Sequence, residues 1–204
     1  TDLSGWTVGK VTTLESTFYA ASKFTGTGLD LWDTTSVTTL AYTFGMASEM
    51  NTDLSGWTVG KVTTLESTFN AASKFTGTGL DLWDTTSVTT LESTFYHATT
   101  MNFDVSKWSV GEVTTMKNMF SNAKSLTSCN KRNIAEAWKS SDAFTKTTTY
   151  DTEWDSVVCA DPCKGGFWSV TGNIPCFDCD GSHICPTGVR TICTPTSNIE
   201  CHVR

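Results

Sequence analysis

The sequence of 204 residues contains few of the side chains that usually carry catalysis. Histidine occurs only three times, at His97, His183 and His202, and charged residues make up 17 % of the chain. General acid–base catalysis mostly uses histidine or carboxylates whose pKa is tuned by the site. The carboxylates here recur with a sequence repeat, as they do in a scaffold. We therefore expect that the protein is not an enzyme and holds neither a cofactor nor a metal.

Other absences bear on partners and location. No run of 18 apolar residues occurs, so no segment is expected to insert into a membrane. The net charge is −7 and Lys and Arg form no stripe, which argues against nucleic acid as a partner. No Asn-x-Ser/Thr sequence occurs, so N-linked glycans are not expected. The chain begins at Thr1 without a signal-peptide pattern, so we expect a processed or excerpted chain.

Threonine, by contrast, fills 39 positions, and 11 Phe and eight Trp supply bulk for a core. Residues 1–51 and 52–102 are nearly the same text, and TDLSGWTVGKVTTLESTF recurs in both without change. The two blocks differ at a few clustered places, such as Tyr19 against Asn70 and Ala41-Tyr42 against Glu92-Ser93.

A shorter period of 25 or 26 residues lies inside each block. Phenylalanine follows each tryptophan of this period by 12 residues, and the tryptophans are Trp6, Trp32, Trp57, Trp83 and Trp108. The consensus is L-x-x-W-x-(V/T)-x-x-V-T-T-(L/M)-x-x-x-F-x-x-A-x-x-(F/M/L). Because one such unit cannot bury its own apolar residues, the period predicts a five-coil repeat solenoid over residues 1–128, with the Trp and Phe columns in its core.

The two halves of the consensus predict different local structures. The front half, L-x-x-W-x-(V/T), has the alternation of a short strand and the spacing of a leucine-rich-repeat strand. The back half, L-x-x-x-F-x-x-A, suits a helical turn or short helix. We therefore predict a leucine-rich-repeat-like solenoid of short parallel strands plus short helices or turns. If Trp points inward, the residues directly after it form an exposed strand face: Thr7, Asp33, Thr58, Asp84 and Ser109.

Two stretches, LSGWTVGKVTTLESTF and FDVSKWSVGEVTTMKNMFSNAKSL, resemble the repeats of BspA-like leucine-rich-repeat surface proteins. The last repeat, with VTTMKNMFSNA, is the most similar, and the resemblance covers residues 1–128. It implies a right-handed parallel solenoid on a secreted or cell-surface protein. It also implies a role in adhesion or structure, and not in catalysis.

The period stops before residue 129, and a helical segment follows. The residues that can share an apolar helix face are Ile134, Ala135, Trp138 and Phe144. Asn130 or Asn133 is the expected start of this helix. An open solenoid end exposes core and needs a lid. Residues 129–159 are therefore predicted to be a C-terminal cap, pinned by a disulfide between Cys129 and Cys159.

Residues 160–204 carry six cysteines with the spacing C-x12-C-x2-C-x5-C-x7-C-x7-C and few large apolar residues. Such a piece cannot fold on a core of its own, so we predict a disulfide-rich module from an oxidising compartment. Zinc at Cys176 and Cys179 is the alternative. CKGGFWSV and CPTG resemble modules of the tumour-necrosis-factor-receptor-like or EGF-like kind. The receptor-like pattern implies the pairs Cys163–Cys176, Cys179–Cys193 and Cys185–Cys201.

The first coil starts without a lid, so either more chain precedes it or another molecule covers it. Its apolar residues form a predicted assembly edge: Leu3, Trp6, Val8, Val11, Leu14 and Phe18. An unpaired edge invites another chain, and a contact between two unlike patches gives an open filament unless it closes a ring. We predict that residues 160–204 of one subunit pack near residues 1–18 of the next.

The two adjacent threonines in the V-T-T segment of each coil have three interpretations. They favour β-structure with ladders of hydroxyl groups. They also suit O-glycosylation, for which TKTTT offers Thr145, Thr147, Thr148 and Thr149. Regular threonine arrays on a flat solenoid can order water, as an ice-binding protein does.

Two main hypotheses for function follow. The first is an extracellular structural protein, secreted or on the cell surface, that is a subunit of a head-to-tail filament or coat. The alternative is a cell-surface adhesin or receptor-type module that binds glycans or other surface proteins. Ice binding is the third hypothesis. Nearly identical repeats favour the filament, because an adhesin is expected to vary on its exposed face.

Overall fold

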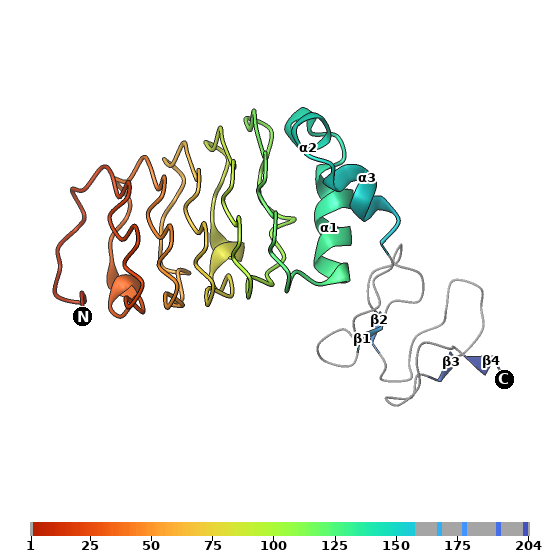
Figure 1. The fold of residues 1–204 in the computed structure, drawn as a ribbon, viewed down its shortest axis with the longest axis horizontal. Coiled ribbons are helices and arrows are strands. Elements are labelled where there is room, and N and C mark those ends of the chain that lie inside the picture. Colours follow the sequence, from red (N-terminus) through yellow and green to blue (C-terminus); the bar gives the residue numbers. More distant parts are fainter. Residues whose placement is uncertain (1, 158–166, 169–176, 179–190, 193–201, 204) are drawn as a thin grey trace.

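The computed structural model describes residues 2–157 and, beyond them, the backbone of four two-residue strands. Five coils stand side by side in a row, and three helices follow at its C-terminal end (Figure 1). We number the coils 1 to 5 and call coils 1, 3 and 5 odd and coils 2 and 4 even; their residues are 1–25, 26–51, 52–76, 77–102 and 103–127. The four strands pair antiparallel, β1 (Phe167–Trp168) with β2 (Phe177–Asp178) and β3 (Thr191–Ile192) with β4 (His202–Val203).

The predicted leucine-rich-repeat-like solenoid of short parallel strands is wrong. Residues 2–157 contain no β-strand, and parallel pairing is limited to one residue per coil, namely Thr13, Thr39, Thr64, Thr90 and Thr115. The L-x-x-W segment bends where a strand would extend. In coil 1 the Trp6 N–H donates back to the Leu3 carbonyl at 3.0 Å. In the even coils the segment forms the 3-10 helices η1 (Leu29–Leu31) and η2 (Leu80–Leu82).

The back half of each coil was predicted to be a helical turn or short helix, and it is neither. Two non-glycine residues in the back half of every coil have left-handed backbone; in coil 1 these are Ser16 and Ala20, with φ of 54° and 57°. A left-handed residue interrupts a right-handed helix. The segment is instead a series of overlapping turns, which we call the arc. The five arcs are residues 14–23, 40–49, 65–74, 91–100 and 116–125.

Backbone hydrogen bonds between neighbouring arcs hold the row together. In coil 1 the N–H donors are Leu14, Ser16, Phe18 and Ala20, and their acceptors are the carbonyls of Thr39, Ala41, Thr43 and Gly45, at 3.2, 2.9, 2.9 and 2.7 Å. The same four bonds join coils 2 and 3, coils 3 and 4, and coils 4 and 5. All of them point the same way. Each arc therefore has a carbonyl side toward coil 1 and an N–H side toward the cap.

The Trp and Phe columns form the core. Neighbouring Trp rings are nearly parallel, with centroids 6.0 to 6.5 Å apart, and neighbouring Phe rings lie 5.6 to 5.7 Å apart. Each of the four buried indoles of the Trp column also donates to a backbone carbonyl of the preceding coil: Trp57 Nε1, for example, donates to the Leu29 carbonyl at 2.8 Å. A buried indole N–H needs such an acceptor, so the column is fixed both by ring contact and by hydrogen bonds.

Odd and even coils differ in the segments around Trp, and the two kinds fit each other. Gly28 in coil 2 has a φ of +88°, and a Cβ there would lie 2.2 Å from the backbone nitrogen of Ser4 in coil 1. Ser36 in coil 2 donates its hydroxyl to the Gly9 carbonyl of coil 1 at 2.8 Å. The structural repeat is therefore two coils long, which accounts for the 51-residue block.

Three helices close the C-terminal end of the row: α1 (Ser128–Trp138), α2 (Asp142–Thr147) and α3 (Tyr150–Asp155). The residues predicted for the apolar helix face are all buried, but Phe144 lies on α2 and the others on α1. Helix α1 starts earlier than predicted. Its N-cap is Thr127, whose hydroxyl accepts from the Asn130 N–H at 3.3 Å.

The cap pairs two of the four backbone N–H groups that coil 5 would donate to a further coil. The hydroxyls of Thr147 and Tyr150 accept the N–H groups of Met116 and Phe120, at 2.9 and 3.1 Å. Side-chain hydroxyls thus replace the carbonyls that a sixth coil would supply. The Phe120 ring also meets Tyr150 and other cap aromatics, so the apolar end of the row is covered.

The first prediction concerns the Trp column. Trp57→Ala should lower the free energy of unfolding by about 3–5 kcal/mol, because a large buried aromatic is removed. Thr58→Ala is the matched control; its side chain is exposed, and we expect a change within about 0.5 kcal/mol. Urea denaturation measures both. Equal losses in the two variants would mean that the Trp ring does not carry the core.

The second prediction concerns the fit between odd and even coils. Gly28→Ala should cost more than about 2 kcal/mol, because its left-handed backbone and the Ser4 backbone both exclude a Cβ. Gly5→Ala is the control, since a Cβ there meets nothing within 4 Å. Thermal and urea unfolding of the two variants should separate them clearly. A Gly28 variant as stable as the Gly5 variant would contradict the two-coil repeat.

Candidate binding face

The two 51-residue blocks differ at seven positions, and all seven lie in the arcs. The pairs are Tyr19/Asn70, Ala41/Glu92, Tyr42/Ser93, Gly45/Tyr96, Met46/His97, Ser48/Thr99 and Glu49/Thr100. Exposed residues outside the arcs are identical in the two blocks. Since exposed positions generally tolerate change, differences confined to the arcs single out one side of the row. We call this side the variable face and define it by Tyr19, Tyr42, Met46, Asn70, Tyr96 and His97.

Three bulky residues of the variable face have left-handed backbone. Tyr42, Met46 and His97 have φ of 56°, 60° and 55°. Coil 1 places the smaller Ser16 and Ala20 at these positions. The rows of hydrogen bonds between arcs impose the backbone conformation, but they do not call for large side chains there. Strained non-glycine residues gather at functional sites, so these three residues point to a role for this face.

Two of the seven differences are coupled by direct contact. The Tyr19 ring lies against Gly45 in the next coil, where a Cβ would come within 2.9 Å of Tyr19 Cδ2. The second block reverses the pair, with Asn70 in coil 3 and Tyr96 in coil 4. Each block thus keeps one tyrosine at this contact but carries it on the opposite coil. The side chains presented to solvent therefore change along the row while the packing beneath them is kept.

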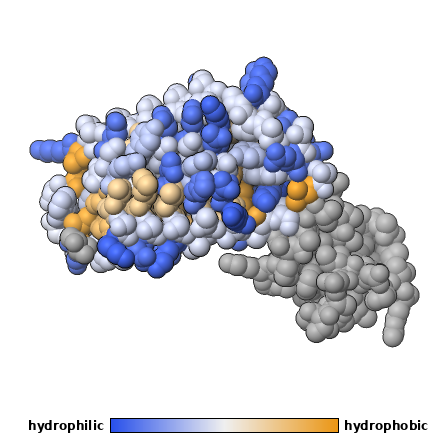
Figure 2. Space-filling model, in the orientation of Figure 1, coloured by the Kyte–Doolittle hydropathy of each residue, from blue (hydrophilic) through white to orange (hydrophobic). Residues whose placement is uncertain are grey.

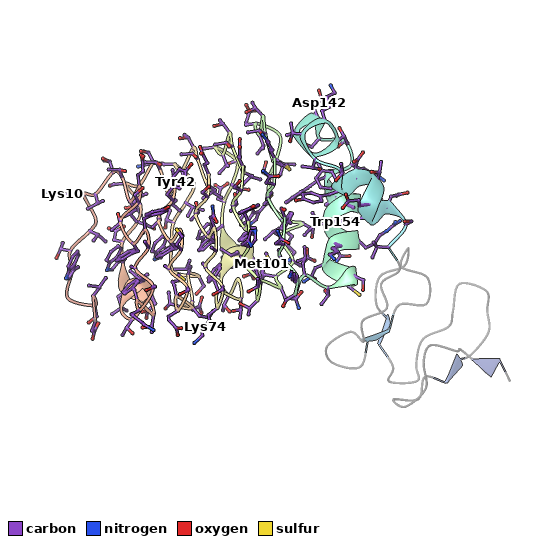
Figure 3. All side chains as sticks on the ribbon, viewed as in Figure 1. Lys10, Tyr42, Lys74, Met101, Asp142 and Trp154 are labelled. Carbon is purple, nitrogen blue, oxygen red and sulfur yellow. The ribbon has the colours of Figure 1, made fainter. Side chains whose placement is uncertain are left out.

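Tyr42, which is labelled in Figure 3, contacts residues of coils 1 and 3. Its hydroxyl donates to Glu66 Oε1 in coil 3 at 2.6 Å, and its ring meets the Tyr19 ring of coil 1 edge-on, with centroids 6.4 Å apart. The hydrogen bond to Glu66, followed by partial burial and the nearby charge of Glu66, raises the pKa of the Tyr42 phenol above its ordinary value.

The other end of the variable face is built around His97. Its ring contacts the Tyr96 ring with centroids 4.3 Å apart, and its Nε2 lies 3.0 Å from Asn122 Nδ2 in coil 5. Three of the four tyrosines of the protein lie on this face. Tyr19 and Met46 are about half exposed. Tyrosine and methionine are enriched where proteins bind one another, and tyrosine with serine and asparagine is typical of variable binding surfaces.

A family model described as "Mycoplasma protein of unknown function, DUF285" matches residues 1–80 and 57–157. The chain belongs to this family. No curated protein and no solved structure matches it. The matched residues span the five coils and the helices α1–α3. The resemblances to BspA-like repeats and to receptor-like or EGF-like modules stay predictions, since none of these matches tests them.

The residues predicted to form an exposed strand face are on the surface but not on a strand. Thr7, Asp33, Thr58, Asp84 and Ser109 are all exposed. Asp33 Oδ1 accepts from the Thr35 hydroxyl at 2.6 Å and from the Thr35 N–H at 3.1 Å, and these bonds lower the pKa of Asp33. The carboxylate is therefore used in a local turn. Asp84 makes in the second block the same bonds that Asp33 makes in the first, so this side of the row is the same in both blocks.

The predicted assembly edge of coil 1 is mostly covered by coil 2. Leu3, Val8 and Leu14 are buried, and Val11 and Phe18 are partly buried. Trp6 is the exception, with 60 % of its surface exposed. The edge is therefore one exposed indole beside a row of backbone carbonyls.

The predicted modification and disulfide sites have different outcomes. Cys129 is in a disulfide; its predicted partner Cys159 lies outside the described residues, as do Cys163, Cys176, Cys179, Cys185, Cys193 and Cys201. The hydroxyls of Thr145, Thr147, Thr148 and Thr149 all donate to acceptors within the cap. Thr147 also contacts coil 5, so an O-glycan there would break the contact between cap and row.

Two searches of the described residues found nothing. Residues 2–157 offer no group of three or more His, Cys, Asp or Glu side chains placed to hold a metal ion. Among the helices α1–α3, none has the length and hydropathy needed to cross a bilayer.

The third prediction tests the contact between Tyr42 and Glu66. Glu66→Gln should lower the pKa of Tyr42 toward its ordinary value, because the carboxylate that favours the protonated phenol is gone. Ultraviolet absorbance titration, compared with Tyr42→Phe to isolate this phenol, measures the change. Glu15→Gln, which alters an exposed carboxylate in coil 1, is the control and should leave Tyr42 unchanged. A titration curve that is the same in both variants would exclude the hydrogen bond.

Proposed function

We propose that the protein is an extracellular binding module of the adhesin or receptor type, and that the variable face holds its partner. One observation carries the proposal: within a duplicated 51-residue block, every difference lies in the arcs, and three of the four tyrosines lie there too. The sequence alone favoured a filament because its surface looked as repetitive as its core. The arrangement of the arcs changes that balance, since the few differences gather on one face.

A rigid frame supports this role. The four backbone bonds per arc and the Trp and Phe columns fix the spacing of the side chains on the variable face. Side chains that are already held in place lose less conformational entropy on binding. Tyrosine adds large contact area with few rotatable bonds. The frame can therefore stay constant while the face carries different side chains in each coil.

A protein partner fits this face better than a sugar does. The exposed groups are phenol rings, a thioether, an imidazole and amides, which together suit a mixed apolar and polar protein surface. The extracellular location is supported by the disulfide at Cys129, because disulfides persist in oxidising compartments.

The fourth prediction tests the face with a phage-displayed library of random 12-residue peptides, selected on the full chain. Hot spots of natural interfaces are rich in aromatic residues, so the enriched peptides should bind at the variable face. The triple variant Tyr19→Ser, Tyr42→Ser and Tyr96→Ser should weaken their binding by more than about tenfold. The triple Thr12→Ser, Thr63→Ser and Thr89→Ser, on exposed positions outside the arcs, is the matched control and should bind as the wild type does.

Three outcomes would contradict the proposal. The library could yield no binders, or the binders could be insensitive to the tyrosine variant. A glycan array could instead bind the chain in a way that depends on these tyrosines, which would make the partner a sugar.

The structural role in a head-to-tail filament stays a prediction. The C-terminal end of the row is closed by the cap, so a second copy would have to reach coil 1 with residues 160–204, which lie outside the described residues. Negative-stain microscopy of the purified chain separates the two roles: filaments favour the structural subunit, and single particles favour the binding module. Ice binding has less support, because the exposed Thr38, Thr63 and Thr89 donate their hydroxyls to carbonyls of the preceding coil.

A further inference from the structure

Among the described residues, no coil packs on the side of coil 1 that faces away from coil 2. In coils 3 and 5 the equivalent side is covered by the preceding coil. Trp6 is 60 % exposed, whereas Trp57 and Trp108, its equivalents in coils 3 and 5, are each 3 % exposed. Hydrophobic surface is visible at this end of the row in Figure 2. In both filled cases an even coil covers the odd one. The contact between coils 2 and 3 therefore shows what coil 1 lacks.

The backbone of coil 1 is ready for a further coil. In coil 3 the arc carbonyls that accept N–H groups from coil 2 are Thr64, Glu66, Thr68 and Asn70, at 3.2, 2.9, 2.9 and 2.6 Å. Their equivalents in coil 1 are Thr13, Glu15, Thr17 and Tyr19, and no N–H group within residues 2–157 donates to these four carbonyls. In coils 2 to 5 the carbonyls at the equivalent positions accept N–H groups from the preceding arc, so the four open carbonyls of coil 1 have the spacing that such an arc requires.

The indole of Trp6, like the backbone of coil 1, lacks the partners that its equivalent in coil 3 has. Trp57 stacks on Trp32 with centroids 6.3 Å apart and donates its Nε1 to the Leu29 carbonyl of coil 2. Among the described residues no carbonyl accepts from Trp6 Nε1. A preceding coil would supply both the ring that covers Trp6 and the carbonyl that accepts its proton.

One side chain makes the contact specific for an even coil. Thr34 in coil 2 accepts the Thr58 N–H at 2.8 Å and donates its hydroxyl to the Thr58 carbonyl at 3.1 Å. Thr7 is the equivalent of Thr58 in coil 1. The odd coils carry Val8 and Val59 where the even coil carries Thr34. An odd coil in front of coil 1 would therefore set an apolar side chain against backbone groups that need a hydroxyl.

We propose that the open side of coil 1 is a docking site for one more coil of the even type. The occupant has the sequence pattern of residues 26–51 and packs on coil 1 as coil 2 packs on coil 3. A second copy of the chain does not fit through coil 5, because Thr147 and Tyr150 already pair two of the N–H groups of its coil 5 and α1–α3 cover that end (Figure 1). This site shares only the backbone of Tyr19 with the variable face and does not depend on the proposed function.

Two extended versions of the full chain test the proposal. One carries a copy of residues 26–51 ahead of Thr1 and so places an even coil on coil 1. The control carries a copy of residues 52–76 and places an odd coil there. The readout is hydrogen exchange of the Trp6 indole N–H by NMR, assigned with Trp6→Phe. The Trp57 indole N–H serves as the internal reference, because its slow exchange reports that the row is folded.

We expect the even extension to slow Trp6 exchange by at least about tenfold and the odd extension to change it by less than about twofold, because only a paired group is protected between openings. No slowing with the even extension would overturn the site. Equal slowing with both would overturn its specificity. Trp6 exchange that slows as the concentration of the unextended chain rises would identify a second copy as the occupant, and would also overturn the proposal.

Discussion

The four backbone hydrogen bonds that repeat between each pair of neighbouring coils point in one direction, and most features of the molecule follow from that. Alternate N–H groups of one arc bond to the carbonyls of the next, so every arc has two unlike sides. The N–H side ends at coil 5, where Thr147 and Tyr150 supply acceptors for the N–H groups of Met116 and Phe120. The carbonyl side ends at coil 1. A row of this kind needs a different solution at each end, and only the cap end has one within the described residues.

The same constraint explains the abundance of threonine. A coil built from turns leaves backbone groups that a continuous strand would pair, and buried or half-buried groups of this kind need partners. Thr43 donates its hydroxyl to the carbonyls of both Leu14 and Leu40, at 2.9 and 2.7 Å. Thr39 accepts the Ala41 N–H at 3.2 Å. Threonine thus completes the backbone pairing of the coil, and its repetition need not mean an external ligand.

The sequence predicted the period and the packing but not the local structure. The spacing of Trp and Phe located the core, and the loss of the period before residue 129 located the cap. Strands were predicted because L-x-x-W-x-(V/T) has the alternation and the spacing of a leucine-rich-repeat strand. The same pattern also fits a tight turn. The turn forms because Trp6 pairs with Leu3 within the coil. The helix prediction failed for another reason: Ser16 and Ala20 have left-handed backbone although serine and alanine are not residue types that favour it, so the sequence gives no sign of it.

The variable face was only half predictable. The differences between Tyr19 and Asn70 and between Tyr42 and Ser93 are visible in the sequence, but their common location depends on the turns of the arc. Of the predicted assembly edge of coil 1, Leu3, Val8 and Leu14 are buried and Trp6 is exposed, while its role in assembly stays a prediction. A pattern of apolar residues does not say which neighbour in the row covers them.

Amide hydrogen exchange along coils 4 and 5 tests the central claim most directly, since the arcs and not strands join the coils. The account predicts the slowest exchange at Ser93, Phe95 and His97, whose N–H groups bond to coil 5, and fast exchange at Ser109 and Gly111, for which no backbone acceptor lies within residues 2–157. Buried hydrogen-bonded amides open rarely, and unpaired surface amides exchange without opening. Slow exchange through Ser109 and Gly111, with fast exchange in the arc of coil 4, would mean that strands join the coils and would contradict the account.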